Sequence, residues 1–474
     1  MSISILQALD DPALFAPWFK DRATWASWRA FLAALFALPM ESPEALATYT
    51  ACTGRVDVPA HQLNEAVLIC GRRAGKSFML ALCAVFLACF FDYRPYLTPG
   101  EKGTIIVIAS DRKQARVILG YIRALLTRVP MLKRMVVRET AESFDLNNDV
   151  VIEVGTASFR SARGYTLCAA LCDEVAFWMS EDSLNPDFEI LDAIRPGMAT
   201  IPNAMLLIGS SPYSKVGVVW DSFKRHYGVA GDPVLVWKAP TRQMNPSVRQ
   251  SIVDNAMARD PAVAQAEWMA EFRQDIASFI DREVVEACVD QGRRENAASY
   301  HFRYKGFVDM SGGSIDSATM AVAHNENGLT IIDVVREIPS PHDPESACDE
   351  FCRIMRDYGI KEVVGDRYSG AWASQAFEKR RLRYKASEQP KSELYKNLLP
   401  KLMAKKIRLV DNPRLISQLA GLERRTSRGG NDSIDHAPGG HDDVANSVAG
   451  VSFATNAPAV AHSSSPLPSS ILGY

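Results

Sequence analysis

The fold of the first half of the chain is decided by Ala66-Val67-Leu68-Ile69-Cys70-Gly71-Arg72-Arg73-Ala74-Gly75-Lys76-Ser77. The first four residues are typical of a buried strand, and the apolar residues after Ser77 are typical of a buried helix. At such a strand-to-helix turn, backbone N–H groups bind phosphate, a lysine reaches the β- and γ-phosphate oxygens, and a serine hydroxyl binds Mg²⁺. The stretch therefore predicts a phosphate-binding loop (P-loop) made by Gly71, Arg72, Arg73, Ala74, Gly75, Lys76 and Ser77. Cys70 stands where the usual spacing has the first glycine, so a simple glycine-containing turn is the alternative.

A second apolar run, residues 167–172, ends in two acidic residues, Asp173 and Glu174. An ATPase needs such a pair: Asp173 is expected in the Mg²⁺ shell, and Glu174 is expected to polarise the attacking water. Together with the loop, the pair predicts ATP hydrolysis. A third apolar run ends at Ser210 and Ser211, which predicts a γ-phosphate sensor that couples hydrolysis to movement, with a plain strand end as the alternative.

Composition excludes several classes of protein. The 474 residues contain 53 Lys and Arg against 55 Asp and Glu, a formal charge of −2, so bulk positive charge does not bind nucleic acid here. No apolar run reaches the roughly 20 residues of a membrane helix, and no secretory signal is visible. The nine cysteines are odd in number and show no CxxC pair, which favours reduced thiols in a soluble, intracellular protein.

Strand-like runs alternate with helix-length stretches between residues 65 and 212, which predicts a parallel sheet covered on both faces. A second α/β region begins near Tyr304. The predicted division is a helical lead-in packed on the ATPase (1–60), a P-loop NTPase domain (61–235), a connector (236–300), a second α/β domain (301–455) and a disordered tail (456–474).

The loop with its internal arginine, the Asp173-Glu174 pair and Gly209-Ser210-Ser211 together resemble the large terminase subunit of tailed bacteriophages and prophages. In that family the loop often lacks the first glycine and carries an arginine where Arg72 stands. Arg163, upstream of Asp173, matches the region that supplies an arginine finger to a neighbouring subunit, and Arg72 is the other candidate for this trans-acting role. The resemblance implies ATP-driven translocation of double-stranded DNA into a prohead and metal-dependent endonucleolytic cleavage of concatemeric DNA.

The same resemblance implies cofactors, partners and location. The cofactors are ATP with Mg²⁺ for the motor and two Mg²⁺ or Mn²⁺ ions for the nuclease. The partners are double-stranded DNA, a portal protein, a small terminase subunit and further copies of the chain in a ring on the portal, with a monomer in solution. The chain would act in the host cytoplasm, transiently at the portal vertex, with no membrane association and no place in the mature virion.

The family also implies an RNase H-like nuclease after the ATPase, and the acidic residues point the same way. Asp309 and Asp366 each end a predicted strand, and Asp442 and Asp443 open a predicted helix. Carboxylates that converge at one sheet edge can hold two metal ions about 4 Å apart. Taken singly, each acid can instead be a turn residue or a helix cap. The choice between Asp442 and Asp443 as principal ligand is open, and His441 and His436 are possible neighbours.

Residues 377–408 hold eleven Lys or Arg against three Glu, a local charge of +8, which favours contact with DNA phosphates over a solvated helix face. Two other functions compete with the terminase hypothesis. A cellular helicase-nuclease of DNA repair should show a second motor core, and none is visible after residue 240. A DNA-binding scaffold with an inactive ATPase should have lost motif residues, but Lys76, Asp173 and Glu174 are intact.

Overall fold

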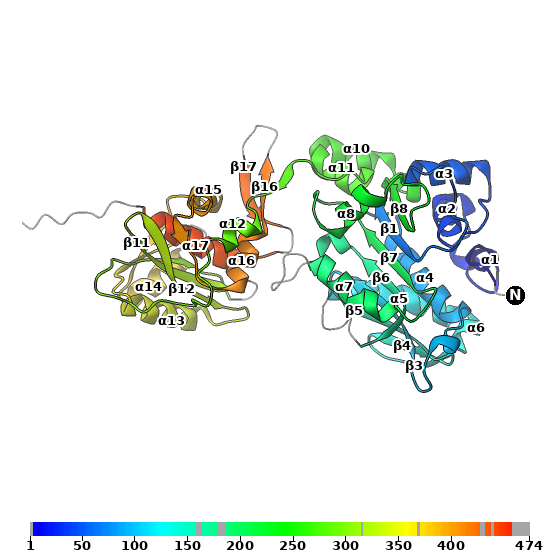
Figure 1. Cartoon of the computed structure of the whole chain (residues 1–474), viewed down its shortest axis with the longest axis horizontal. Helices are drawn as coiled ribbons and strands as arrows, with labels where there is room; N and C mark the ends of the chain where they lie inside the picture. Colours follow the sequence, from blue (N-terminus) through cyan, green and yellow to red (C-terminus); the bar gives the residue numbers. More distant parts are fainter. Residues whose placement is uncertain are drawn as a thin grey trace, which may run out of the picture. The chain divides into compact units, whose positions relative to one another are not determined.

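The computed structural model describes residues 3–157, 164–178, 186–313, 316–366, 370–426, 432–437 and 440–456 (Figure 1). The chain forms two compact units. Residues up to Ala277 make most of the first unit, and Ser278–Arg424 with the residues from His441 onward make most of the second. The predicted connector, 236–300, thus lies partly in each unit, because its first residues complete the first sheet. Among the described residues, no helix has the length and apolar character needed to cross a membrane.

The first unit is built on an eight-stranded sheet of order β3-β4-β5-β2-β6-β7-β1-β8. All pairs from β5 to β8 are parallel, whereas β4 runs antiparallel to both of its neighbours. The prediction of a parallel sheet in this region is therefore confirmed. The strands are β1 (Glu65–Cys70), β2 (Gly103–Ala109), β3 (Val136–Glu139), β4 (Ser143–Leu146), β5 (Val150–Thr156), β6 (Thr166–Asp173), β7 (Met205–Ser210) and β8 (Val234–Ala239).

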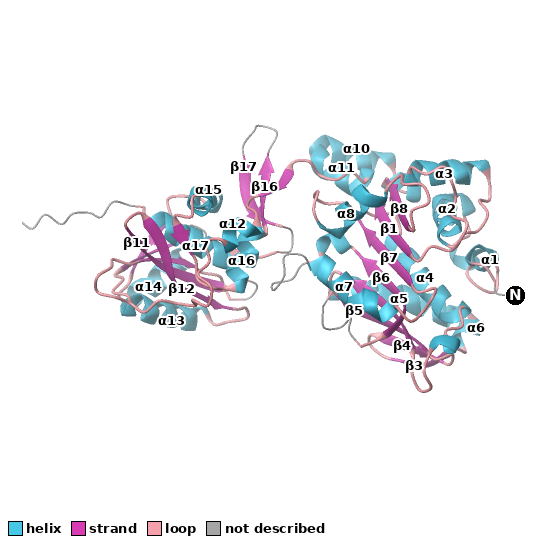
Figure 2. Ribbon diagram, in the orientation of Figure 1, coloured by secondary structure: helices cyan, strands magenta, loops and turns pink. Residues whose placement is uncertain are grey.

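Helices flank this sheet (Figure 2). The helix that follows the P-loop has a mostly apolar surface and is almost wholly buried, as a central helix must be. The N-terminal helices join the same core through side chains such as Trp28 and Phe31. The helices are α1 (Ile5–Asp10), α2 (Ala26–Leu35), α3 (Pro43–Thr53), α4 (Lys76–Phe90), α5 (Arg112–Arg128), α6 (Pro130–Lys133), α7 (Pro186–Met198), α8 (Gly217–His226), α9 (Thr241–Met244), α10 (Gln250–Arg259) and α11 (Pro261–Met269).

The second unit contains a six-stranded sheet of order β14-β13-β10-β11-β12-β15. Strand β10 pairs antiparallel with β11 and β11 antiparallel with β12, whereas β13 runs parallel to β10 and β14 parallel to β13. Three antiparallel strands extended by parallel strands on the side of the first are the RNase H-like arrangement, as predicted. The strands are β10 (Lys305–Asp309), β11 (Ala318–Glu326), β12 (Leu329–Ile338), β13 (Glu362–Gly365), β14 (Arg383–Ala386) and β15 (Ile407–Arg408).

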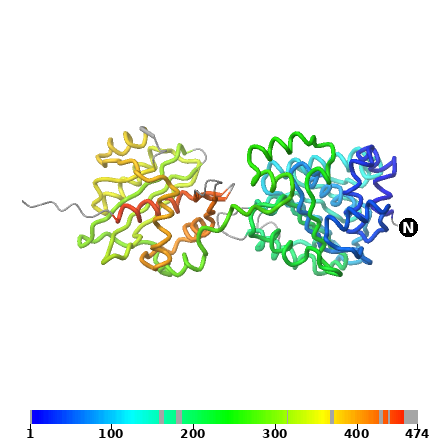
Figure 3. The backbone as a smooth tube through the Cα atoms, turned by 90° about the horizontal axis from the view of Figure 1, so that it is seen from above, coloured from blue at the N-terminus to red at the C-terminus, as the bar shows by residue number. Residues whose placement is uncertain are grey.

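Two apolar cores cover the faces of the second sheet, one beneath α13 and α14 and the other beneath α15, α16 and α17. Figure 3 shows α17, near the red end of the chain, passing through the second unit, and most of its residues are buried. The helices are α12 (Arg282–Glu286), α13 (Pro344–Asp357), α14 (Gly370–Lys379), α15 (Lys391–Met403), α16 (Pro413–Ala420) and α17 (Asp443–Ala454). A separate three-stranded sheet has the order β17-β16-β9, with β9 at Ile276–Ser278, β16 at Leu422–Thr426 and β17 at Asp432–His436.

The close approach of α17 to β10 depends on Gly450. A Cβ atom at this position would lie 2.3 Å from the ring of Phe307, which is fully buried on β10. We expect Gly450→Ala to lower the free energy of unfolding of the second unit by about 1–3 kcal/mol, because the overpacking exceeds the gain of about 1 kcal/mol from the better helix former. Thermal or urea unfolding measures this change. A variant as stable as the wild type would show that α17 can shift to accommodate a methyl group.

Candidate nucleotide and metal sites

The P-loop leads from the carboxyl end of β1 into α4, and its lysine is held by oxygens from neighbouring strands. The buried Lys76 Nζ donates hydrogen bonds to the carbonyl oxygen of Cys70 (3.0 Å) and to Ser211 Oγ (3.0 Å), and it lies 3.3 Å from Glu174 Oε1. Ser77 Oγ donates to Asp173 Oδ2 at 2.6 Å. The P-loop and the acidic pair, which were predicted from separate stretches, therefore meet. Lys76 lies beside Glu174, and Ser77 is bonded to Asp173.

Strand β7 lies between β1 and β6, so the residues at its carboxyl end lie between the loop and the acidic pair. The backbone N–H of Ser211 donates to Glu174 Oε2 at 3.1 Å. Ser210 Oγ accepts a hydrogen bond from Ala176 N (3.1 Å) and donates one to the carbonyl of Ser211 (2.9 Å). Of the two predicted coupling serines, Ser210 is thus bonded to the segment after Glu174, and Ser211 is bonded to the Glu174 carboxylate.

The acidic pair has the electrostatics of a cation site. Burial, and then the charge of Glu174, raise the pKa of Asp173 to about 6, against the opposing effects of Ser77 and Lys76. Its Oδ1 is buried and has no hydrogen-bond partner among the described residues. A hard cation such as Mg²⁺ prefers oxygen ligands, so this carboxylate and the adjoining serine hydroxyl fit the predicted ion. Glu174 itself has a left-handed backbone, with φ at +54°, directly after the strand.

The unusual first position of the loop has a steric explanation. A Cβ atom on Gly71 would lie 2.2 Å from Thr241 Oγ1 and 2.8 Å from the carbonyl oxygen of Glu267. Glycine is therefore required at position 71, one residue later than the standard spacing, where the loop packs against α9 and α11. Cys70 belongs to β1 and is fully buried, as a core residue can be.

Of the two candidate arginines, only Arg72 is among the described residues. The side chain of Arg72 is 58% exposed, and its Nη1 lies 3.3 Å from Glu267 Oε1. An exposed guanidinium at the loop is compatible with either a local role or contact with another copy of the chain. Arg163 lies outside the described residues, so its predicted role as an arginine finger stays a prediction.

Two predicted acids of the second unit bind one amide. Asn446 Nδ2 donates to Asp309 Oδ2 at 2.6 Å and to Asp366 Oδ2 at 3.1 Å. Burial, followed by the charges of Asp366, Asp443 and Asp442, raises the pKa of Asp309 to about 7. The carboxylates from β10, the end of β13 and the start of α17 are therefore brought together. Asn446 was missed in the sequence, although it lies one helical turn after Asp442.

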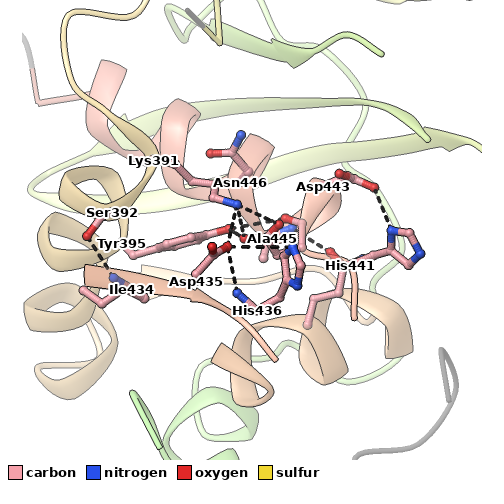
Figure 4. Close-up of polar contacts among 12 residues, drawn as sticks. Lys391, Ser392, Tyr395, Ile434, Asp435, His436, His441, Asp443, Ala445 and Asn446 are labelled. Carbon is pink, nitrogen blue, oxygen red and sulfur yellow. Dashed lines mark hydrogen bonds and ion pairs between the residues drawn. The ribbon is translucent and has the colours of Figure 1, made fainter. Parts of the chain in front are cut away.

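Asp442 and Asp443 have different surroundings, and Figure 4 shows Asp443 beside His441. Asp442 is buried and accepts a hydrogen bond from Tyr395 OH at 2.8 Å, and Lys391 Nζ lies 3.0 Å from it. Asp443 Oδ2 has no hydrogen-bond partner among the described residues, and His441 Nδ1 lies 4.0 Å away. Burial and the charge of Asp442 raise the pKa of Asp443 to about 6. Asp443 thus has the greater capacity for a metal ion.

A second group of possible ligands adjoins Asp442. One atom from each of Asp435, His436 and Asp442 lies within 4.8 Å of the others. Lys391 Nζ lies 2.9 Å from Asp435 Oδ1, so an ammonium group already neutralises part of this cluster. Asp435 and Lys391 were not singled out as site residues in the sequence; Lys391 comes from α15, distant in the chain from Asp442, and Asp435 comes from β17, whose pairing the sequence does not reveal.

The basic stretch 377–408 is largely paired within its own unit. Arg380 contacts Glu345 and Asp349, Lys391 contacts Asp435 and Asp442, and Lys401 donates to the carbonyl oxygen of Ser452. The pairs Arg383–Glu362 and Arg408–Asp290 add to this neutralisation, whereas Lys385 and Lys396 pair with Glu388 and Glu393, which the charge of +8 already includes. The local charge of +8 therefore overstates the positive potential available for a DNA backbone.

Fold and sites together define a chain with a P-loop NTPase unit followed by an RNase H-like unit with clustered carboxylates. No family model matches the chain, and no curated protein matches it. Several solved structures match the chain. One is the large terminase of bacteriophage HK97, which is 16% identical, with a TM-score of 0.39. The match covers 88% of this chain and 96% of that chain. The large terminase of a thermophilic bacteriophage is 11% identical, with 89% of this chain and 98% of that chain covered and a TM-score of 0.39.

A third solved structure is the magnesium-bound nuclease of the large terminase of the thermophilic phage G20c. It is 15% identical, covers 37% of this chain and 97% of that chain, and has a TM-score of 0.32. The chain is thus similar in fold to phage large terminases over most of its length and to a terminase nuclease over 37% of it.

The raised pKa of Asp309 predicts a pH-dependent effect of Asp309→Asn on the metal-free protein. The folded protein binds a proton at Asp309 up to about pH 7, whereas the unfolded chain releases it near pH 4. Stability of the wild type therefore falls as pH rises through this window. Asparagine carries no charge, so in EDTA at pH 8 the variant should melt higher, by roughly 2–4 °C per kcal/mol gained, and the difference should vanish near pH 4. A variant that melts lower at pH 8 would contradict this account.

Proposed function

We propose that the chain is the large subunit of a phage or prophage terminase, an ATP-driven DNA-packaging motor joined to a metal-dependent endonuclease. The observation that carries the proposal is that one chain holds two assembled sites. In the first unit, Lys76, Glu174 and Ser211 form one bonded set, and the adjoining Ser77 and Asp173 form another. Asp309, Asp366, Asp442 and Asp443 gather in the second.

In the motor, each residue has a distinct part. Lys76 would bind the β- and γ-phosphate oxygens, and Ser77 with Asp173 would hold Mg²⁺, which neutralises charge on the phosphates. Glu174 would orient and polarise the attacking water as general base. Its hydrogen bond from the Ser211 backbone links this carboxylate to β7, so a change at the γ-phosphate can move the end of that strand. Arg72 and Arg163 are the two candidates for an arginine that acts on a neighbouring subunit.

In the nuclease, Asp309, Asp366 and Asp443 would be the principal ligands of two Mg²⁺ or Mn²⁺ ions, which supply water activation and stabilise the leaving oxygen. Asp442 would contribute charge and, through Lys391 and Tyr395, fix the start of α17. Asn446 would keep Asp309 and Asp366 in position for the ions. The high pKa of Asp309 fits a group whose charge is stabilised when cations bind.

The proposed partners follow from this role: double-stranded DNA, a portal protein, a small terminase subunit and further copies of the chain in a ring on the portal. The proposed location is the host cytoplasm, at the portal vertex during packaging. The fold of the second unit counts against a helicase, since its described residues form an RNase H-like sheet where a second motor core would be needed. The complete set of contacts around Lys76 and Glu174 counts against an inactive ATPase.

We expect Lys76→Ala to reduce the rate of ATP hydrolysis by at least about 100-fold, because a preorganised positive charge on the phosphates is lost. Glu174→Gln should still bind ATP but hydrolyse it far more slowly, because an amide is not a base. Phosphate release and nucleotide titration measure the two effects. Lys102→Ala is the control, since Lys102 pairs with Asp145 at the surface of the same unit. Wild-type hydrolysis by Lys76→Ala would remove this lysine from the site.

We expect Asp309→Asn and Asp443→Asn to abolish cleavage of supercoiled plasmid in Mg²⁺ or Mn²⁺ while ATP hydrolysis persists, because the two sites use different residues. Asp349→Asn, which removes an exposed carboxylate from α13, should leave cleavage unchanged. Gel assays of plasmid nicking and linearisation, run beside phosphate release, make the comparison. Cleavage by Asp309→Asn at the wild-type rate would exclude the two-metal assignment.

A further inference from the structure

Side chains from outside the P-loop bind three consecutive carbonyl groups of its backbone. The donors come from α2, from α9 and from the residue after α9, and none belongs to a nucleotide-binding motif. The hydrogen bonds are Thr241 Oγ1 to the carbonyl oxygen of Arg72 (2.8 Å), Asn245 Nδ2 to that of Arg73 (2.8 Å) and Trp28 Nε1 to that of Ala74 (2.9 Å). The loop is thus fixed from its outer side, one peptide after another.

These bonds set the direction of the N–H groups in the loop. In a trans peptide, the carbonyl of one residue and the N–H of the next point in opposite directions. Outward carbonyls at residues 72, 73 and 74 therefore turn the N–H groups of Arg73, Ala74 and Gly75 toward the interior of the loop. Inward N–H groups are what a phosphate-binding loop offers to its anion.

The backbone of the loop needs such support. Arg73 has φ at +63° and Gly75 at +104°, with Ala74 between them outside the left-handed region. Alternation of this kind makes a concave nest of N–H groups, but a non-glycine residue at positive φ is strained, because its Cβ atom crowds the backbone. The hydrogen bond from Asn245 acts on the carbonyl of Arg73, the strained residue, and offsets part of that strain.

The donors are held rigidly, as supporting residues should be. Trp28 is 1% exposed and Thr241 is fully buried. The ring of Trp28 packs on Phe31 of the same helix, and its Nε1 atom lies 3.3 Å from the Cβ position of Gly75. The hydroxyl of Thr241 lies against Gly71 so closely that no side chain fits there.

We propose that Trp28, Thr241 and Asn245 are positioning residues that hold the P-loop in its phosphate-binding conformation. The inference rests on the proposed ATPase function and adds residues on which that activity depends. These residues touch the loop backbone and act on the nucleotide through it.

The test removes two of the donors: Thr241→Val keeps the shape of the side chain, and Trp28→Phe keeps an aromatic ring but loses the N–H group and some volume. Binding of magnesium tripolyphosphate to the full-length protein, measured by calorimetry, isolates the phosphate cradle from the rest of a nucleotide. We expect roughly fivefold weaker binding for each variant and at least tenfold for the double variant, as the loss of one buried hydrogen bond implies. The KM for ATP should rise more than kcat falls, because Glu174 is untouched.

Matched controls separate positioning from stability. Leu9→Ala removes volume from the core around the N-terminal helices, and Thr53→Val removes a buried hydroxyl that donates to the carbonyl of Tyr49 on α3. Both should lower the melting temperature and leave tripolyphosphate binding unchanged. Asn245 is half-buried, so Asn245→Ala tests the same proposal if Trp28→Phe or Thr241→Val fails to fold. Wild-type affinity in all three donor variants, or equal loss in the controls, would overturn the proposal, whereas a wild-type protein that binds no tripolyphosphate would overturn the ATPase function.

Discussion

The nucleotide site depends on the parallel pairing of β1 with β7 and of β7 with β6. Strands that run in one direction end at one edge of a sheet, so residues that are far apart in the sequence meet there without any long insertion. Lys76 comes from the loop after β1, Ser211 follows β7 and Glu174 follows β6. The hydrogen bonds among them are consequences of strand order, and the buried helices on both faces keep that order fixed.

The second unit brings like charges together. Four carboxylates come from the end of β10, the end of β13 and the start of α17, and their mutual repulsion with burial raises the pKa values of Asp309 and Asp443. The protein reduces this repulsion with an amide from Asn446 and an ammonium from Lys391. Such a cluster destabilises the metal-free fold and is stabilised by divalent cations, so binding of the ions and order in this region are coupled.

Much of this could be predicted from the sequence, because the decisive signals are local. A strand, a glycine-rich turn, a lysine and a helix follow one another between residues 66 and 90, and the acids of the second unit each stand at the end of a strand or the start of a helix. The supporting residues could not be predicted, because their contacts cross long stretches of chain. Nothing near Trp28 indicates a bond to Ala74, and nothing near Lys391 indicates Asp442. Asn446 is the exception, since its spacing from Asp442 places both on one helix face. The predicted connector differs because β8 pairs with β1, which composition does not reveal.

Because the residues that support the P-loop come from both sides of the motif region, they limit how short a fragment could keep the proposed ATPase activity. A fragment spanning residues 61–235 would retain every nucleotide-binding motif residue of the first unit. It would lack Trp28, which precedes the fragment, and Thr241 and Asn245, which follow it, and it would expose the face of Gly71 that now packs on α9 and α11. The motif residues are therefore a smaller set than the residues that give the loop its shape, and the minimal catalytic module extends from the N-terminal helices to at least α11.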